Sequence, residues 1–238
     1  MKIKSTGAGP DVVVLPGFVT SAATPGLDAL ASTARVHVVE LPGFGVDPVP
    51  DSIRTVVDLA CAVKEELRAQ DLLGAPLVGQ SFGGWVAAEV ASISPVERLV
   101  LVDPFGLRIV GEPRVDMFDM PRESVLDLVY ADRSKAPTEW ATVAERAGYA
   151  AVARFAWNPY LCDLSLPNRL RQLDMPTLMV WGADDRVVPV SHAALFAELI
   201  PEAIVEVIPD AGHDPSCDQP DAFARVVGDF LAVKESAR

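Results

Sequence analysis

Short apolar runs alternate along this chain with longer segments in which apolar residues recur at helical spacing. The apolar runs predict buried strands at Val12–Leu15, Val36–Glu40, Leu77–Gly79, Leu99–Val102, Thr177–Trp181 and Val205–Ile208. The segments between most of them predict helices at Gly26–Ala34, Ile53–Ala69, Phe82–Ala91, Ser191–Leu199 and Asp221–Val233. This alternation is typical of a mostly parallel α/β sheet that is covered by helices on both faces. Ligands of such sheets bind at the carboxyl ends of the strands.

The alternation stops in the middle of the chain. The segment there is rich in aromatic residues and methionine and is interrupted by prolines. Apolar spacing within it predicts helices at Glu123–Tyr130 and Thr138–Phe155. The chain therefore divides into a core, residues 1–103 and 176–238, and a helical insert, residues 104–175.

The motif that most directly indicates chemistry is Gly79-Gln80-Ser81-Phe82-Gly83, between a predicted strand and a predicted helix. A G-x-S-x-G pattern in that setting is typical of a nucleophile elbow. Glycines on both sides remove the Cβ atoms that would collide in so tight a turn. The alternative is a small polar residue that merely fills the turn. The strand before and the helix after the motif favour Ser81 as a nucleophile.

A serine hydroxyl needs a base to remove its proton, and the chain has three histidines. His37 lies in a predicted core strand and is expected to be packed there. His192 follows Ser191 at a predicted helix start and is expected to be solvated. His213 lies in a loop after the last predicted strand, from which its ring can reach another loop. His213 is therefore the candidate base.

Two positions can supply the acid that orients the base. Asp184 and Asp185 follow the predicted strand that ends at Trp181, although both could instead cap the next helix or pair with Arg186. Asp103 follows another predicted strand and is a second candidate. Its structural alternative is a turn before a proline, since a residue in that position avoids the helical region.

These motifs resemble those of the α/β-hydrolase superfamily, and the resemblance covers nearly the whole chain. The similar segments are Leu15-Pro16-Gly17-Phe18, Leu41-Pro42-Gly43-Phe44-Gly45, the elbow around Ser81, Trp181 to Pro189, and Gly212-His213 with Gln219-Pro220 behind it. The resemblance implies the α/β-hydrolase fold, in which the helical insert forms a lid over the catalytic serine. The chain order serine, aspartate, histidine is also that of the family.

By that resemblance Ser81 is the nucleophile, His213 the general base and then acid, and Asp185 the residue that orients His213. The family spacing G-x-x-D-x-x-x-P, present here from Gly182 to Pro189, favours Asp185 over Asp184. We prefer Asp185 to Asp103, the second candidate acid.

The resemblance also places an oxyanion hole at the backbone N–H groups of Phe82 and Phe18. One departure is Pro16, at a position where members usually carry a histidine that helps to hold the loop. Another lies at the amino end, where members generally have two more antiparallel strands. Only Met1–Thr6 precedes the strand at Val12 here, so we expect shortened amino-terminal strands and a shortened sheet edge.

A lid in this place would roof a mainly apolar pocket. The candidate pocket residues are Trp140, Phe155, Trp157 and Met117. The alternative is that the aromatic residues of the insert only pack it onto the core, which we expect for most of them. Candidate clamps for a substrate carboxylate are Arg108, Arg114 and Arg154, although surface solvation is the more ordinary role of such residues.

A serine at the elbow suits acyl transfer, whereas haloalkane dehalogenases and epoxide hydrolases of this superfamily carry aspartate there. We therefore expect a serine hydrolase, esterase-like, that acts on a small, mainly apolar carboxylic ester, thioester or lactone. Carbon–carbon hydrolysis of vinylogous diketones uses the same triad, but members of that group commonly follow the histidine with tryptophan, and Asp214 stands here. A non-catalytic small-molecule binding protein on this fold is the third interpretation, and it would not need an intact triad.

The composition of the chain limits the classes of binding partner and the cellular location that we expect. The 238 residues carry a formal net charge of −13, which argues against nucleic acid and anionic membrane surfaces. No apolar run approaches the length of a membrane span, and the start of the chain lacks a secretory signal, so we expect a cytoplasmic monomer or homodimer. Three cysteines without metal spacing, and the lack of a G-x-G-x-x-G or P-loop motif, predict no metal and no cofactor.

Overall fold

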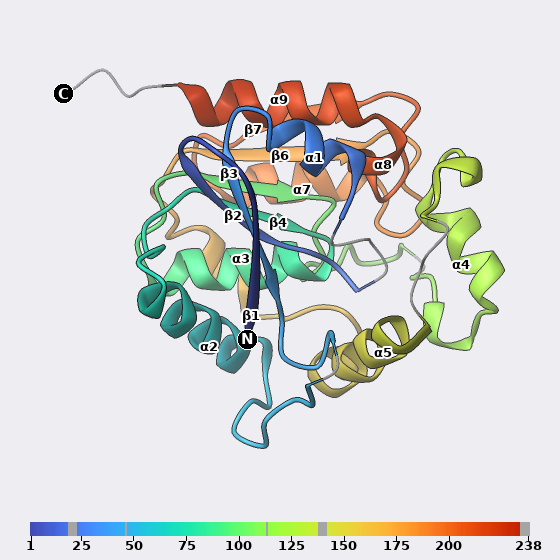
Figure 1. Ribbon diagram of the computed structural model, residues 1–238. Helices are drawn as coiled ribbons and strands as arrows, with labels where there is room; N and C mark the ends of the chain where they lie inside the picture. The colour runs from blue at the N-terminus through green and yellow to red at the C-terminus, as the bar shows by residue number, and fades with distance from the viewer. Residues whose placement is uncertain (19–22, 46, 113, 138–141, 234–238) are drawn as a thin grey trace.

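The computed structural model describes residues 1–18, 23–45, 47–112, 114–137 and 142–233. A seven-stranded sheet with the order β1-β3-β2-β4-β5-β6-β7 runs through this part of the chain (Figure 1). Its strands are β1 (Lys2–Gly7), β2 (Asp11–Leu15), β3 (Arg35–Glu40), β4 (Leu77–Gln80), β5 (Leu99–Val102), β6 (Thr177–Gly182) and β7 (Ile204–Ile208). All neighbouring pairs are parallel except β1 with β3. The prediction of a mostly parallel sheet is confirmed.

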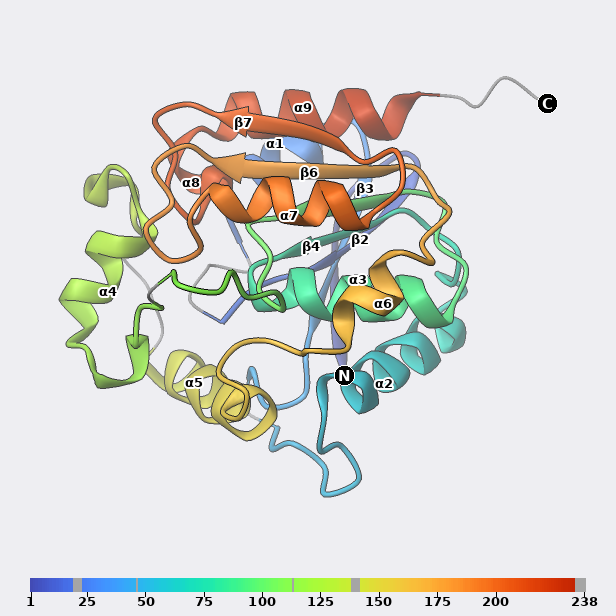
Figure 2. The same cartoon turned by 180° about the vertical axis from the view of Figure 1, so that it is seen from behind.

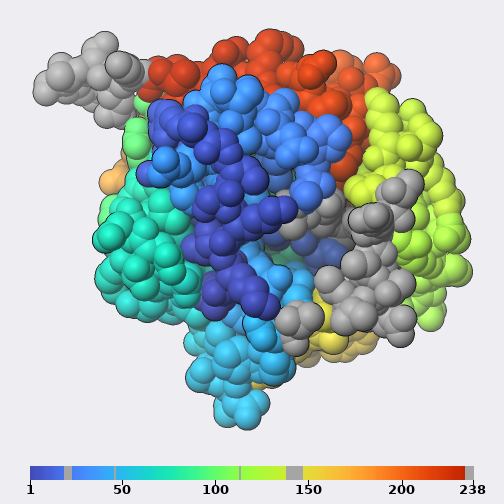
Figure 3. All heavy atoms as spheres, viewed as in Figure 1, coloured from blue at the N-terminus to red at the C-terminus, as the bar shows by residue number. Residues whose placement is uncertain are grey.

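Strand β1 forms one edge of the sheet and was not predicted as a strand. It pairs antiparallel with β3 from Lys2 opposite Glu40 to Gly7 opposite Arg35. Most of its residues are exposed, and Figure 3 shows this dark blue segment on the surface of the molecule. A strand that buries no face lacks the apolar alternation by which strands are found in a sequence. A single antiparallel strand thus precedes β2, in agreement with the shortened amino-terminal edge.

Helices cover both faces of the sheet (Figures 1 and 2). Along β2 the side chains alternate, so that Val12 and Val14 join one apolar cluster and Val13 and Leu15 the other. The first cluster contains residues of α1 (Pro25–Leu30) and α9 (Pro220–Ala232). The second contains residues of α2 (Val56–Ala69), α3 (Phe82–Ile93), α6 (Leu166–Leu170) and α7 (Ser191–Leu199). The short helix α8 (Pro215–Asp218) precedes α9.

Helix α2 begins three residues later than the apolar pattern predicted, because a capping box fixes its start. The Thr55 hydroxyl accepts the N–H of Asp58 at 3.0 Å. In return, the Asp58 carboxylate accepts the N–H groups of Thr55 at 2.9 Å and of Arg54 at 3.0 Å. These bonds occupy backbone donors that have no partner within the helix. Helix α1 similarly ends at Leu30, four residues before the predicted end.

The segment between β5 and β6 is helical, as predicted, but it is not a single unit. It contains η1 (Met117–Asp119), α4 (Arg122–Val129), η2 (Arg133–Lys135), α5 (Thr142–Ala156) and α6. The predicted start of the second helix, Thr138, lies outside the described residues. Figure 2 shows α4 beyond the carboxyl ends of β6 and β7, with α5 below α4 on the same side of the molecule. Helix α6, which was not predicted, packs instead on α3, where Arg169 pairs with buried Glu89 at 2.6 Å. The division into core and insert stays a prediction.

Two further findings concern the whole described chain. Within these residues, no helix combines the length and the apolar composition needed to cross a bilayer. The three cysteines are free thiols, with Cys61 exposed and Cys162 and Cys217 buried.

Candidate active site

Ser81 occupies a strained turn between β4 and α3. Its φ of 57° is in the left-handed region that favours glycine. The glycines on each side are required for packing, as predicted. A Cβ on Gly79 would lie 2.5 Å from the Ala87 Cβ, and one on Gly83 would lie 2.1 Å from the Leu15 carbonyl oxygen. The turn therefore presents Ser81 at the carboxyl edge of the sheet and holds the loop after β2 against the start of α3.

The structure brings Ser81, His213 and Asp185 into one hydrogen-bonded chain. The Ser81 Oγ lies 2.8 Å from Nε2 of His213, and the His213 Nδ1 lies 2.8 Å from Oδ2 of Asp185. A carboxylate can only accept, so Nδ1 carries the proton and Nε2 is free to accept the serine proton. Ser81 and His213 are fully buried. This is the arrangement in which an imidazole can act as a general base toward a serine.

Backbone donors in its own loop hold Asp185 in place. Its Oδ1 accepts the N–H groups of Val187 at 2.7 Å and Val188 at 2.9 Å, which leaves Oδ2 for the histidine. Its neighbour Asp184 is exposed, so the structure selects Asp185 for the contact with His213. Gly182, the first residue of the G-x-x-D-x-x-x-P pattern, is required at this place. A Cβ on it would lie 2.0 Å from the Gly212 carbonyl oxygen. The loops that carry the aspartate and the histidine approach each other through this glycine.

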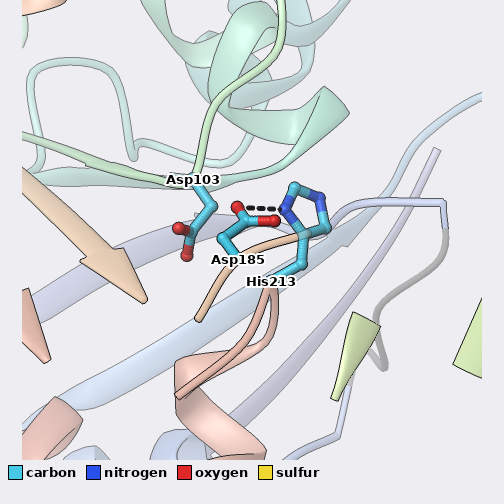
Figure 4. Close-up of side chains that lie close together, drawn as sticks. All are labelled: Asp103, Asp185 and His213. Atoms are coloured by element: carbon cyan, nitrogen blue, oxygen red, sulfur yellow. Dashed lines mark hydrogen bonds and ion pairs between the residues drawn. The ribbon is translucent and has the colours of Figure 1, made fainter. Parts of the chain in front are cut away.

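Asp103, the second candidate acid, lies behind Asp185 rather than beside the histidine (Figure 4). It is fully buried, and its Oδ1 accepts the Gly182 N–H at 2.9 Å. Its Oδ2 has no hydrogen-bond partner among the described residues. Burial and the negative charge of Asp185 raise the pKa of Asp103 well above its usual range. The pKa of Asp103 is thus shifted in favour of its neutral form, and the geometry favours Asp185 as the acid in contact with His213.

Asp103, Asp185 and His213 also each offer an atom of the kind that binds metal ions, all within 4.8 Å of one another. A metal ion at this place would need the Nδ1 lone pair of the histidine. That nitrogen is instead committed to a 2.8 Å hydrogen bond with Asp185. The donor set therefore fits a hydrogen-bonded triad better than a metal centre.

The helix geometry favours one of the two predicted oxyanion donors. The Phe82 N–H is the first of α3, and the first N–H groups of a helix have no acceptor within it. It directly follows Ser81, so it is available to an oxygen that develops charge beside the serine. Phe18 lies in the loop after β2, and its ring packs edge-on against Tyr149 with a centroid distance of 5.2 Å. Its role as the second donor stays a prediction.

The candidate pocket residues occupy different environments. Phe155 stacks on Phe82, with ring centroids 6.4 Å apart. Met117 is buried in the apolar core, and Trp157 is 56% exposed. Trp140 lies outside the described residues. An aromatic side chain that the sequence did not single out, Phe105, lies 5.5 Å from the His213 ring.

Two of the candidate arginines, and His37, have structural partners. Arg114 donates to the backbone carbonyls of Tyr160 and Leu107, and Arg154 donates to that of Pro50 at 3.2 Å, while Arg108 is exposed. His37 is buried, as expected, between Ser5 and Asp11, each at 2.8 Å.

The expectation that His192 is solvated was wrong. This residue is only 6% exposed, and its Nδ1 lies 3.2 Å from the Pro189 carbonyl oxygen. Burial lowers its pKa below the usual value, although Glu112 opposes the effect. Its place in the first turn of α7 did not reveal this, because the loop after β5 covers it.

The sequence matches the model of the alpha/beta hydrolase family over residues 12–226. The chain belongs to the alpha/beta hydrolase family. Two curated relatives align along almost its whole length. A 2-hydroxy-6-oxo-6-(2'-aminophenyl)hexa-2,4-dienoic acid hydrolase of Metapseudomonas resinovorans is 29% identical and covers 95% of this chain and 85% of its own. A pimeloyl-acyl-carrier-protein methyl ester esterase of Aeromonas hydrophila is 28% identical and covers 97% of this chain and 99% of its own.

Solved structures of this family are similar over nearly the same length. A serine hydrolase involved in carbazole degradation superimposes with a TM-score of 0.78 at 26% identity, covering 98% of this chain and 94% of its own. A meta-cleavage product hydrolase gives the same TM-score of 0.78, also at 26% identity, over 96% of this chain and 93% of its own. The alpha/beta hydrolase fold predicted from the sequence is thereby confirmed.

The first test separates the two candidate acids. Asp185→Asn should lower kcat on an ester substrate by roughly 10⁴-fold, because an amide at this position favours the wrong tautomer of His213. Asp103→Asn should cost far less, since its amide oxygen still accepts the Gly182 N–H. Asp184→Asn, on the exposed neighbour, is the control and should match the wild type. A larger loss in Asp103→Asn than in Asp185→Asn would transfer the acid role to Asp103.

The raised pKa of Asp103 predicts a pH dependence of stability. Folded Asp103 retains a proton that the unfolded chain releases above about pH 3.9, so its contribution to the free energy of unfolding falls as pH rises past that value. The slope is at most about 1.4 kcal/mol per pH unit, until the folded carboxyl also ionises. Asp103→Asn removes this term, so urea unfolding should show the variant gaining stability relative to the wild type between pH 5 and pH 8. A difference that stays constant, or a variant that loses stability relative to the wild type as pH rises over this range, would contradict the raised pKa of Asp103.

Proposed function

We propose that this protein is a serine hydrolase that cleaves small, mainly apolar carboxylic esters, thioesters or lactones through an acyl-enzyme on Ser81. The observation that carries the proposal is the unbroken hydrogen-bond chain from Ser81 through His213 to Asp185, with 2.8 Å at each link. Family membership and the relative named as a methyl ester esterase support it. The cytoplasmic location and the monomeric or homodimeric state stay predictions from the sequence.

In the first half of the reaction, the Ser81 Oγ attacks the substrate carbonyl carbon while its proton passes to Nε2 of His213. The carbonyl π electrons move onto the oxygen, which the Phe82 N–H stabilises. When the tetrahedral intermediate collapses, the bond to the leaving oxygen or sulfur breaks, and His213 returns the proton to that atom. Asp185 stabilises the imidazolium that exists between these two transfers.

The second half repeats the sequence with water as the nucleophile. Nε2 of His213 accepts a proton from water as the water attacks the acyl carbon. Collapse of the second intermediate breaks the bond to Ser81 Oγ, which recovers its proton from His213 and releases the carboxylic acid. Loss of one oxyanion donor costs on the order of 10²–10³ in rate, so the Phe82 N–H is a substantial part of the proposed catalysis.

The surroundings of the serine favour an apolar substrate. Phe82 contacts three aromatic rings, with centroid distances of 5.6 Å to Phe44, 5.9 Å to Trp85 and 6.4 Å to Phe155. Aromatic faces of this kind accept alkyl and aryl groups and exclude water, which strengthens hydrogen bonds to the oxyanion. Ser81 has no exposed surface in this structure, so substrate entry requires the covering side chains to move.

A second candidate function is carbon–carbon hydrolysis of a vinylogous diketone. It is favoured by the 29% identity to the dienoic acid hydrolase and by the structural likeness to the meta-cleavage product hydrolase. The position after the histidine argues against it, because Asp214 is turned toward Gln80 and Ser216 and offers no ring to a substrate. Loss of the absorbance of a 2-hydroxy-6-oxo-dienoate, compared with release from a matched ester, discriminates between the two reactions.

Ser81→Ala tests the nucleophile directly. The variant should lose ester turnover and labelling by a fluorophosphonate probe, because only an activated serine reacts, while its circular dichroism and melting temperature remain those of the folded protein. Ser191→Ala, at the exposed start of α7, should label like the wild type. Labelling and turnover that survive in Ser81→Ala would disprove the serine mechanism. A folded wild-type protein that does not label would favour the binding-protein interpretation.

A series of p-nitrophenyl esters of increasing acyl length tests the apolar pocket. Each buried methylene adds up to about 0.8 kcal/mol, so kcat/KM should rise by up to about fourfold per methylene until the pocket is full and then fall. Phe155→Ala removes a ring above Phe82 and should move the optimum to longer chains. Esters with a terminal carboxylate are the matched controls and should be poor substrates. Equal rates across neutral and charged esters would count against an apolar pocket.

A further inference from the structure

The end of helix α4 is attached to both loops that carry the triad. The His213 N–H donates to the Val129 carbonyl at 2.7 Å, and the Arg186 guanidinium donates to the Asp127 carbonyl at 2.7 Å. The last carbonyls of a helix have no donor within it, so these two bonds occupy groups that would otherwise need water. The end of helix α4 therefore contacts both the loop that carries His213 and Arg186, the residue after Asp185.

A buried carboxylate joins the same two segments. The Asp218 Oδ2 accepts the N–H of Gly212 at 2.8 Å and the N–H of Ala131 at 2.8 Å, and its Oδ1 accepts the N–H of Asp132 at 3.3 Å. Asp218 is fully buried. Hydrogen bonds from N–H groups to a buried carboxylate are short and about twice as strong as neutral ones. One side chain thus fixes the peptide before His213 and the chain that follows α4.

The two segments touch backbone to backbone. A Cβ on Gly212 would lie 2.4 Å from the Val129 carbonyl oxygen and 2.8 Å from the Ala131 nitrogen. Only glycine permits this approach without displacing one segment. The Lys135 ammonium, in the turn after α4, adds a bond to the Asp218 backbone carbonyl. Contacts within the protein therefore account for the close approach of the Gly212 segment to the end of α4.

The other side of the histidine loop is attached to the nucleophile strand. The Gln80 Nε2, on the residue before Ser81, donates to Oδ1 of Asp214 at 3.0 Å, and the Ser216 hydroxyl donates to the same oxygen at 2.6 Å. The residue after His213 is thus bonded to β4, while Asp218 bonds the peptide before His213 to the chain that follows α4.

From these contacts we infer that Asp218 is a positioning residue for His213, and that α4 is a fixed part of the active site through it. The inference rests on the proposed function, because His213 has to be the general base. Asp218 holds the Gly212 peptide at a fixed distance from the end of α4. This sets the position of the His213 imidazole relative to the Ser81 hydroxyl. It touches neither the reacting atoms nor the proposed apolar pocket.

Removal of the carboxylate should reduce the rate rather than the affinity. In Asp218→Ala the N–H groups of Gly212, Ala131 and Asp132 lose their acceptor, and the Gly212 peptide can shift to find another. A misplacement of about 1 Å at a reacting group costs on the order of 10²-fold, so kcat should fall by between about tenfold and about a hundredfold. KM should stay near the wild-type value, because the residues around the pocket are unchanged.

The experiment compares Asp218→Ala, Asp218→Ser and Asp218→Asn with wild type, using a short p-nitrophenyl ester and active sites counted by fluorophosphonate titration. The amide oxygen in Asp218→Asn can still accept the Gly212 and Ala131 N–H groups, so this variant should retain most of kcat. The serine variant keeps one acceptor and should lie between the other two. If Asp218→Ala does not fold, the serine variant still tests the inference. Asp58→Ala, which removes a carboxylate that accepts two N–H groups in the capping box of α2, is the matched control and should lose melting temperature without losing kcat.

Two results would overturn the inference. One is a wild-type kcat per titrated site in the folded Asp218→Ala or Asp218→Ser variant, even at a lower melting temperature, which would assign Asp218 to stability alone. The other is a raised KM with unchanged kcat, which would assign it to substrate binding. Failure of the proposed function appears elsewhere, as a wild-type protein whose Ser81 does not label, so the two failures are distinguishable.

Discussion

The burial of three polar side chains in one hydrogen-bonded line is the constraint on which the rest of this structure depends. Ser81, His213 and the side chain of Asp185 are all removed from water. An unsatisfied polar group in such a place costs on the order of 1–3 kcal/mol, and an unpaired charge costs more. Each atom must therefore find a partner in the protein. The positive φ at Ser81 and the backbone donors at Asp185 both serve that requirement.

The same constraint explains the chemistry of the acidic groups. Two backbone N–H groups and an imidazole N–H face the oxygens of Asp185. Asp103 lies close to it but receives one N–H, and burial together with the neighbouring charge raises its pKa. Two aspartates at the ends of adjacent strands thus differ in environment because they differ in donors. A raised pKa at Asp103 favours a site with a single negative charge beside the histidine.

Residue patterns predicted the fold and brought together the candidate triad, but not the contacts that hold it. The apolar strands, the elbow and the loop positions of Asp185 and His213 are local features, and each has a local signature. Strand β1 was missed because it is polar on both faces, and the burial of His192 because the covering loop is distant in sequence. Asp218 gave no sign of its role. Its partners are N–H groups, which every residue except proline has, so no side-chain pattern identifies them.

Two helices of the insert, α4 and α5, therefore contact the site in different ways. The end of helix α4 and the residues just after it are joined to the loops that carry Asp185 and His213 by short hydrogen bonds. Helix α5 instead reaches the site through aromatic faces, as where Phe155 stacks on Phe82. Hydrogen bonds fix a geometry, whereas stacked rings tolerate changes of size and shape. A change in the α5 rings can alter which acyl group fits while Ser81 and His213 stay in contact. A change at the end of α4 would act on the loop that carries His213, so under the proposed function the rate and the substrate range would depend on different parts of the insert.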